Sequence, residues 1–334
     1  MRSAVARFRT PPKEFRMTKD GYPERPVVPV SAWLDNAEVC QEAIDAAAGL
    51  PHTGESEFER FYSYLLVDEP IIQLMPGYFL PLWVENEMRP QTLRALAVAA
   101  KLENARNRWL DEMVDGHAPL TSLGSPHGLN EAVVGLTNRL YAAVLPHERA
   151  ASFVGRLATL YARHSLSLVL DGKGFDLLRR PLTLAEYEVQ AKARHSSVRA
   201  PLDALLTLIG ADEEQYTRAT DSWHAWGLGA QLYDDALDVE EDFRHGTLTW
   251  SVSRTLERFE GHPPANGDEF YGICLKEGIV VETLRCAEAH FARAADLACA
   301  TFPRWTAVQR GCLRQARTLR EDYERLLNLG PLDQ

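Results

Sequence analysis

The stretch "DDALDVEEDFRHGTLTW", residues 234–250, decides how the fold is interpreted, because its acidic residues recur at helical spacing. Asp234, Asp238 and Asp242 are four residues apart, so on a helix their carboxylates lie along one face. Asp235 flanks this face. Large apolar residues occupy the other faces, which predicts that much of the helix is buried.

The same face continues upstream through Gly227 and Gln231, where a salt-bridged surface helix would carry Lys or Arg. Aligned carboxylates on a mostly buried helix need a counter-charge, because an isolated buried carboxylate is costly. Mg²⁺, which prefers oxygen ligands, would supply it. The alternative is a solvated acidic face near the end of a helix.

A second acidic cluster occurs in "LDEMVDG", residues 110–116. Asp111 and Asp115 are four residues apart and would share a helix face with Arg108, while Glu112 lies about 100° round the helix. Two stacked carboxylates repel each other by only a few tenths of a kcal/mol on an exposed helix. This cluster alone is therefore compatible with metal binding but does not establish it.

The two clusters together make a stronger prediction. They lie about 120 residues apart in a helical chain, so their helices can face each other across a bundle, where metal sites are often built. A pocket with metal on both walls and apolar side chains below suits an amphipathic diphosphate. The metals would hold the diphosphate, and the cavity would hold the hydrocarbon.

The composition is that of an ordinary globular protein of 334 residues, 46% of them hydrophobic. Its net charge of −11 argues against a nucleic-acid partner, because no basic stripe offsets it. The five cysteines form no C-x-x-C pair and are expected to be buried thiols of a reducing compartment. No apolar run approaches the ~18 residues that cross a bilayer, so we expect no stable membrane insertion, and a cytoplasmic location.

Helical periodicity dominates the chain after a Pro-rich, basic segment, residues 1–30, that we expect to be a flexible arm. Residues 31–330 show no convincing alternation of period two, which predicts one all-α domain of about ten to twelve helices. The apolar cavity inferred from the two acidic clusters would lie at its centre. Thr183 and Glu186 predict a capping box. Pro201 should kink or split the helical segment that begins at this capping box.

The motif "QLYDDALD", followed by "RHGTLTW", resembles the second aspartate-rich motif, Q-x-x-D-D-x-x-D, of the class I isoprenoid synthase superfamily. It is similar in particular to that of the trans-prenyl diphosphate synthases. "LTLAEYEVQAKARHSSVRAPLDALLTLIGA" resembles the region before that motif, and "LDEMVDG" looks like a degenerate first motif, near the D-N-x-x-D form of the class IB, or large-terpene, synthases. The resemblance covers roughly residues 90–250 and implies the isoprenoid synthase fold.

The resemblance also implies roles for individual residues. Two or three Mg²⁺ ions would lie between the motifs, with Asp111, Asp115, Asp234 and Asp238 as catalytic residues. The implied metal ligands are Asp111, Glu112, Asp115, Asp234, Asp235, Asp238 and Asp242; for Asp235 and Asp242 the alternative is that they support the other ligands without contacting the metal. The candidates for binding the diphosphate are Arg108, Lys192, Arg194 and Arg244. Gln231, Trp226 and Tyr233 are further substrate-binding candidates, because aromatic faces can stabilise carbocations, although such side chains are also ordinary core.

Two departures from the family pattern shape the expected reaction. The sequence has no Gly-Lys-Arg signature near the N-terminus, and no paired arginine closely follows the first motif. Prenyltransferases use these residues to bind isopentenyl diphosphate and the allylic diphosphate. We therefore predict a terpene synthase (cyclase) that ionises one linear prenyl diphosphate to a hydrocarbon or alcohol. The alternatives are a trans-prenyltransferase that makes a linear isoprenyl diphosphate, and a non-catalytic helical partner protein. The family commonly forms dimers, so a homodimer is also expected.

Overall fold

The structure is a computed structural model of the whole chain, and it describes residues 36–50, 55–66, 82–83, 85–114, 124–171, 180–259 and 266–328. Within these residues the chain forms thirteen α-helices, one short 3-10 helix and no strand, which confirms the all-α class. The helices are α2 (Asn36–Ala48), α3 (Glu55–Leu66), α5 (Pro90–Val114), α6 (Gly124–Val144), α7 (His147–Asp171), α9 (Leu184–Arg194), η2 (Ser197–Arg199), α10 (Ala200–Ile209), α11 (Glu213–Leu237), α12 (Val239–His245), α13 (Trp250–Leu256), α14 (Gly267–Lys276), α15 (Ile279–Ala298) and α16 (Pro303–Asn328). The arm expected over residues 1–30 lies outside the described residues.

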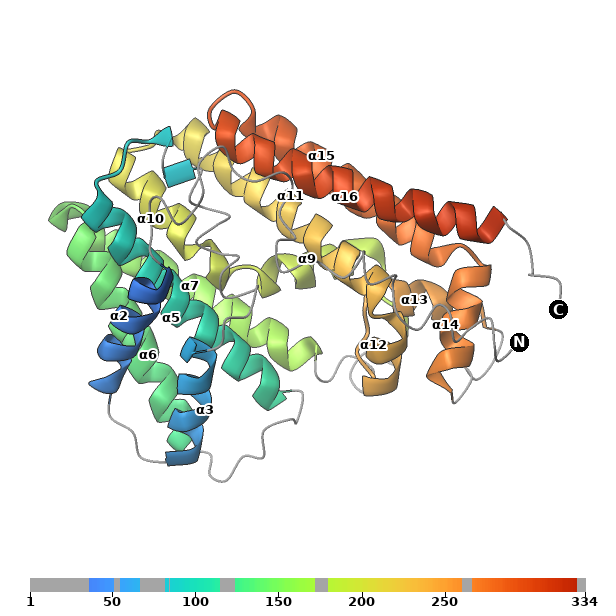
Figure 1. Cartoon of the computed structure of the whole chain (residues 1–334), viewed down its shortest axis with the longest axis horizontal. Helices are drawn as coiled ribbons and strands as arrows, with labels where there is room; N and C mark the ends of the chain where they lie inside the picture. Colours follow the sequence, from blue (N-terminus) through green and yellow to red (C-terminus); the bar gives the residue numbers. More distant parts are fainter. Residues whose placement is uncertain are drawn as a thin grey trace.

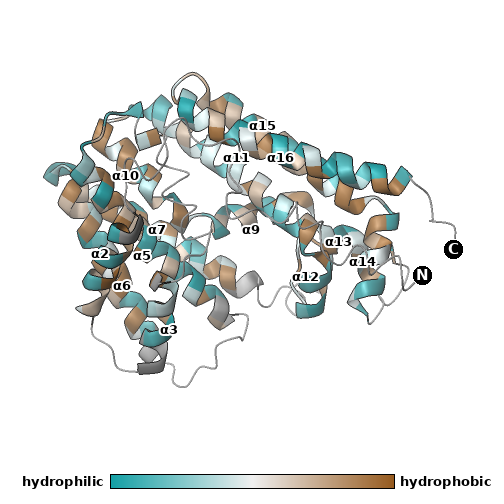
Figure 2. Ribbon diagram, in the orientation of Figure 1, coloured by the Kyte–Doolittle hydropathy of each residue, from teal (hydrophilic) through white to brown (hydrophobic). Residues whose placement is uncertain are grey.

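The helices form two packed groups that share the long helix α11 (Figure 1). Helix α11 packs along most of its length against α15, which also packs against α16, and it contacts α10 near its N-terminal end and α9, α12 and α13 toward its C-terminal end. On the other side of the molecule, α5 packs against α2, α3, α6, α7 and α10. The buried side chains accordingly form two clusters, one that includes Trp109 and Trp223 and another that includes Leu232 and Trp250. Apolar and polar residues alternate along most helices, as expected of helices with one buried face (Figure 2).

The segment between Thr183 and Gly210 folds as two helices, as the proline predicted. The Thr183 hydroxyl accepts a hydrogen bond from the Glu186 backbone N–H, and the Glu186 carboxylate accepts one from the Thr183 N–H, which confirms the capping box. Helix α9 ends at Arg194, and Pro201 lies in the first turn of α10, where its missing N–H costs nothing. Gly210 ends α10 in the left-handed conformation, with φ 67°.

Two glycines let neighbouring helices approach α11 closely. A Cβ on Gly229 would lie 2.8 Å from Cδ1 of Phe291 in α15, and one on Gly227 would lie 3.0 Å from Cδ2 of His195, at the end of α9. The indole N–H of Trp223 donates to the His195 carbonyl at 3.3 Å and holds the same junction. The end of α9 is therefore pressed against α11, next to the acidic residues.

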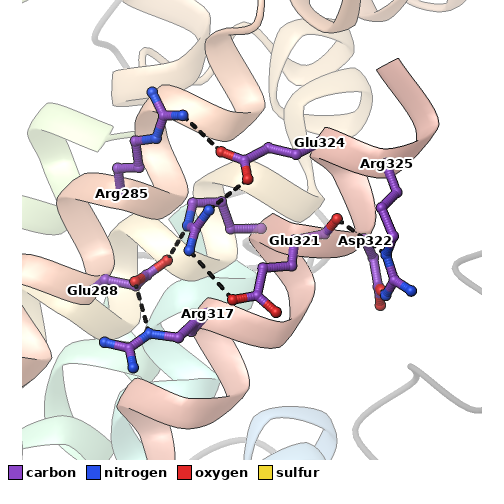
Figure 3. Close-up of polar contacts among 8 residues, drawn as sticks. Arg285, Glu288, Arg317, Glu321, Asp322, Glu324 and Arg325 are labelled. Carbon is purple, nitrogen blue, oxygen red and sulfur yellow. Dashed lines mark hydrogen bonds and ion pairs between the residues drawn. The ribbon is translucent and has the colours of Figure 1, made fainter. Parts of the chain in front are cut away.

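Helices α15 and α16 are joined by a network of ion pairs (Figure 3). The Glu288 carboxylate accepts hydrogen bonds from Arg317 at 3.4 Å and from Arg320 at 2.5 Å. The Glu324 carboxylate accepts from Arg285 and Arg320, both at 2.6 Å. Arg320 thus lies between two carboxylates that come from different helices.

Two expectations from composition can be compared with the structure. None of the five cysteines, all of which lie in described residues, forms a disulfide. They are not uniformly buried, however: Cys274 is buried, whereas Cys299 is exposed, because it lies at the C-terminal cap of α15. In the described part of the chain, no helix is long and apolar enough to cross a membrane.

Candidate functional site

The acidic face predicted around residue 234 is continuous, although the helix that carries it is divided. Helix α11 ends at Leu237, and Asp238 connects it to α12, which makes the number of helices larger than expected. The Asp238 N–H still donates to the Asp234 carbonyl at 3.0 Å, and the Asp242 N–H donates to the Asp238 carbonyl at 2.8 Å. These are the i to i−4 bonds of an α-helix, so the three aspartates remain on one side.

The carboxylates of this face lie close enough to repel one another. Burial raises the pKa of Asp242 to about 9, and the neighbouring Asp235 and Asp238 charges add to the effect. Burial also raises the pKa of Asp238 to about 7, with further contributions from Asp234 and Glu241. Such mutual repulsion is relieved by a bound cation. The face therefore has the charge of a cation site.

Asp111 of α5 lies opposite this face, across the Arg194 side chain. An Nη2 of Arg194 is 3.6 Å from Oδ1 of Asp111. Burial raises the pKa of Asp234, the Arg194 charge opposes that rise, and the Asp111 charge adds to it. Asp234 nevertheless remains exposed to solvent. The Arg194 guanidinium therefore lies near carboxylates of both acidic helices, and we call this group of residues the acidic site.

Asp235 has a structural role in this arrangement. Its Oδ1 accepts a hydrogen bond from the Gln231 amide at 3.0 Å, and its Oδ2 accepts one from the Trp250 backbone N–H at 2.9 Å. Because Asp235 is only 1% exposed and both its oxygens are engaged, these contacts favour the supporting role over direct ligation. Gln231, expected to contact substrate, is likewise committed to Asp235.

The structure separates the four basic candidates. Arg194 lies between the acidic helices, and its backbone carbonyl accepts a hydrogen bond from Nδ1 of His164 at 2.7 Å. Arg108 approaches Asp111 from one turn earlier in α5, at 3.9 Å.

Lys192 and Arg244 point elsewhere. Lys192 is exposed, and its charge acts on His224 and His290. Arg244 pairs with Glu240, one turn earlier in α12. Of the four candidates, Arg194 is thus the one that the structure brings to both acidic helices.

The two aromatic candidates face the C-terminal helix. The Trp226 indole N–H donates to the Cys312 sulfur of α16 at 3.5 Å, and the ring stacks on Trp223 with centroids 5.0 Å apart. Burial raises the pKa of Tyr233 to about 12, with contributions from Tyr323 and Cys312. Both aromatic side chains therefore pack toward α16, which matches the core role that the sequence left open.

The first acidic motif is only partly described. Asp115 lies outside the described residues, and the side chain of Glu112 is also outside them. Within the described residues, no group of three or more His, Cys, Asp or Glu side chains is arranged to hold a metal ion directly. The donor chemistry still fits Mg²⁺, since Asp111 and the three aligned aspartates offer oxygen ligands and strong negative charge.

Sequence reasoning missed the polar interior beside the first motif. Burial raises the pKa of Glu103 to about 8, and the Tyr141 hydroxyl donates to its carboxyl at 3.2 Å. Arg106 donates to the Asn130 side chain at 2.7 Å and lies 4.8 Å above the Tyr161 ring. In the sequence, the helical spacing of Glu103 from Asp111 was only a weak signal of this polar interior. The interior here is partly polar, and the central apolar cavity stays a prediction.

A cavity of about 440 Å³ lies at the other end of α11 and contains none of the predicted site residues. It is separated from Asp234 by roughly 30 Å of helix, at 1.5 Å per residue. Its arginines, Arg149 and Arg156, donate hydrogen bonds to Thr207 near the end of α10. These two arginines have a local structural role there, and the acidic site around Asp111, Arg194 and Asp234 remains the candidate functional site.

No family model and no curated protein matches the sequence, but several solved structures match the fold. The geranylgeranyl pyrophosphate synthetase of the archaeon Geoglobus acetivorans matches with a TM-score of 0.64 and 17% identity, over 86% of this chain and 98% of that one. The geranylgeranyl pyrophosphate synthase of Lactobacillus brevis gives 0.61 and 14%, over 86% and 95%. That of Corynebacterium glutamicum, complexed with isoprenyl diphosphate and magnesium, gives 0.53 and 12%, over 85% and 99%. The chain therefore has the class I isoprenoid synthase fold of the trans-prenyl diphosphate synthases, as its motifs predicted.

Proposed function

We propose that the protein is a Mg²⁺-dependent trans-prenyltransferase, which ionises an allylic prenyl diphosphate and joins the prenyl group to isopentenyl diphosphate. The observation that carries the proposal is the meeting of Asp111 and Asp234 from different helices around Arg194. The three solved structures compared above are geranylgeranyl pyrophosphate synthases. They support chain elongation better than the cyclase that the missing basic motifs predicted.

The proposed roles follow from the positions of the side chains. Asp111, Asp234, Asp238 and Asp242 would hold Mg²⁺, which, when bound, neutralises the charge that develops on the departing diphosphate. Arg194 would donate charge-assisted hydrogen bonds to the same group. Asp235 would hold the end of α11 in position through its hydrogen bond from the Trp250 backbone N–H.

A terpene synthase remains the second candidate, and one observation favours it. Among the described residues, the basic side chains paired with Asp111 are Arg194 and Arg108. Elongation requires a second diphosphate to be bound, whereas ionisation of a single prenyl diphosphate requires fewer cationic groups.

Product analysis separates the candidates. The purified protein would be incubated with Mg²⁺ and geranyl, farnesyl or geranylgeranyl diphosphate, with and without isopentenyl diphosphate, and the products identified by mass spectrometry. A longer linear diphosphate formed only with isopentenyl diphosphate supports the proposal. A hydrocarbon or alcohol formed without it supports the terpene synthase. Lack of any product from every substrate would support the non-catalytic partner protein.

A matched pair of variants tests the site itself. Asp234→Asn removes a carboxylate from the acidic site. We expect product formation to fall about a hundredfold or more, as when a charge-stabilising group is lost. Asp221→Asn changes an exposed aspartate on the same helix and should leave turnover unchanged. Equal turnover in the two variants would show that the acidic face does not bind the metal.

A further inference from the structure

A buried amine on α5 contacts a thiol where a carboxylate would be the usual partner. Nζ of Lys101 lies 2.5 Å from the Cys40 sulfur, which comes from α2. Lys101 is only 2% exposed. Among the described residues, no Asp or Glu lies within ion-pair distance of it, although buried ammonium groups are normally paired with acids. The contact thus brings a nucleophilic nitrogen and an oxidisable sulfur together.

The sulfur is accessible, whereas the nitrogen lies beneath it. Cys40 is partly exposed and forms no disulfide, so a small oxidant can reach it from the surface. The surroundings of the other cysteines differ: the exposed Cys299 thiol donates to the Asp296 carbonyl, and Cys312 contacts the Trp226 indole. Neither of these contacts includes an amine.

We propose that Cys40 and Lys101 form a covalent nitrogen–sulfur cross-link when the protein is oxidised by a peroxide. In the first step the Cys40 sulfur attacks the peroxide, an S–O bond forms, the O–O bond breaks, and a sulfenic acid and one water result. In the second step the Lys101 nitrogen attacks that sulfur, an N–S bond forms and the S–O bond breaks. The departing hydroxide takes a proton from nitrogen and leaves as a second water. One peroxide is reduced, and the sulfur is oxidised by two electrons.

The cross-link would fix α2 to the helix that carries the first acidic motif. Asp111 follows Lys101 by ten residues, or about 15 Å of helix. The same two helices are already joined by Arg94, whose guanidinium pairs with Glu38 and Glu42 at 2.6 Å. Oxidation would add a covalent bond to this interface without requiring the helices to move apart.

Peptide mapping tests the proposal. The full chain would be treated with hydrogen peroxide, digested with trypsin and analysed by mass spectrometry. We expect the peptide of Cys40 joined to that of Lys101, lighter by two hydrogens than the sum of the two, with loss of cleavage after Lys101. A thiol reductant should reverse both changes. Recovery of sulfenic or sulfinic acid on Cys40 with Lys101 still cleaved would overturn the proposal.

Two variants and an internal standard complete the experiment. Cys40→Ser should abolish the linked peptide and leave cleavage after Lys101 intact, with the same circular dichroism as the parent. Lys101→Met keeps a long buried side chain without the amine, and Cys40 should then accumulate as sulfinic acid. If Lys101→Met does not fold, Cys40→Ser still decides the result. Oxidation of the exposed Cys299 in the same sample shows that the peroxide was active, and a linked peptide at Cys299 would indicate non-specific coupling and contradict the proposal.

Discussion

Arg194 is the side chain whose position is most informative about chemistry. It is the last residue of α9, its carbonyl is held by His164, and its guanidinium lies beside Asp111. Burial lowers the pKa of His164 to about 4. The ring is therefore neutral near pH 7, and because a carbonyl can only accept, Nδ1 must carry the proton. This contact orients the end of α9 so that the arginine reaches the acidic helices.

Replacing Arg194 should impair substrate binding and turnover. We expect Arg194→Ala to lower kcat/KM by about a hundredfold, the usual loss when one preorganised donor to a developing charge is removed. Lys192→Ala provides the matched control, because Lys192 is exposed on the same helix and lies near His224 and His290. Steady-state kinetics with the substrate found by product analysis gives both values. Similar losses in the two variants would contradict the assignment.

At the scale of helices, the site depends on how closely α9 approaches α11. Gly227 lies on the face that carries Asp234, and the His195 ring packs against it. The sequence indicated that Gly227 was on this face, but nothing in the sequence indicated that a helix end would fill the space above it. That information resides in the packing between helices, which local patterns do not contain.

Gly227→Ala should therefore move α9 as well as destabilise the fold. Alanine favours a helix over glycine by up to ~1 kcal/mol, but the new Cβ would lie 3.0 Å from the His195 ring, and overpacking typically costs about 1–3 kcal/mol. We expect a net loss of stability in urea unfolding and a higher KM. Gly155→Ala is the control, since on α7 a Cβ would meet nothing within 4 Å, and it should stabilise the protein. A stabilised Gly227→Ala variant would show that the His195 ring can move aside at little cost in free energy.

The ion pairs between α15 and α16 should contribute to stability in a salt-dependent way. Arg320 bonds to both Glu288 and Glu324, and its side chain is 16% exposed. Arg325 forms an ion pair with Asp322, one turn earlier on the same helix, and donates to the Glu321 carbonyl; its side chain is 73% exposed. Because partly buried networks are screened less than exposed pairs, Arg320→Ala should lower the melting temperature more than Arg325→Ala at every salt concentration. Equal melting temperatures would show that the network contributes little.

For the molecule as a whole, the apolar periodicity was sufficient to predict an all-α chain, and the resemblance of its aspartate-rich motifs to those of isoprenoid synthases implied the fold. The spacing of the aspartates predicted which carboxylates share a face, because Asp234, Asp238 and Asp242 depend only on helical geometry. It did not reveal that Asp235 is bonded to the Trp250 amide, since that contact joins segments fifteen residues apart through a turn. Nor did it reveal that Trp226 faces α16, because several faces of this helix are apolar and the sequence does not say which neighbour each one meets.

The buried Glu103 gives the whole molecule a specific dependence of stability on pH. Its pKa is raised by burial from 4.5 to about 8, so between these values the folded protein holds a proton that the unfolded chain has lost. Stability must therefore fall as pH rises through this range. Burial lowers the pKa of His164 and His195 from 6.5 to about 4 and about 3. The unfolded chain then binds more protons below pH 6.5, and stability rises with pH there.

These opposing effects place the informative window between pH 6.5, above which the contribution of the two histidines fades, and pH 8, the approximate pKa of Glu103. Glu103→Gln mimics the protonated side chain and can still accept from the Tyr141 hydroxyl. It should flatten the fall in unfolding free energy across this window by up to about 1.4 kcal/mol per pH unit, the value for one proton. Urea titrations of both proteins in the same Mg²⁺-free buffers cancel the contributions of Asp238 and Asp242, which both proteins share. Parallel slopes would show that Glu103 is ionised in the folded state, and that Arg106 rather than a proton balances its charge.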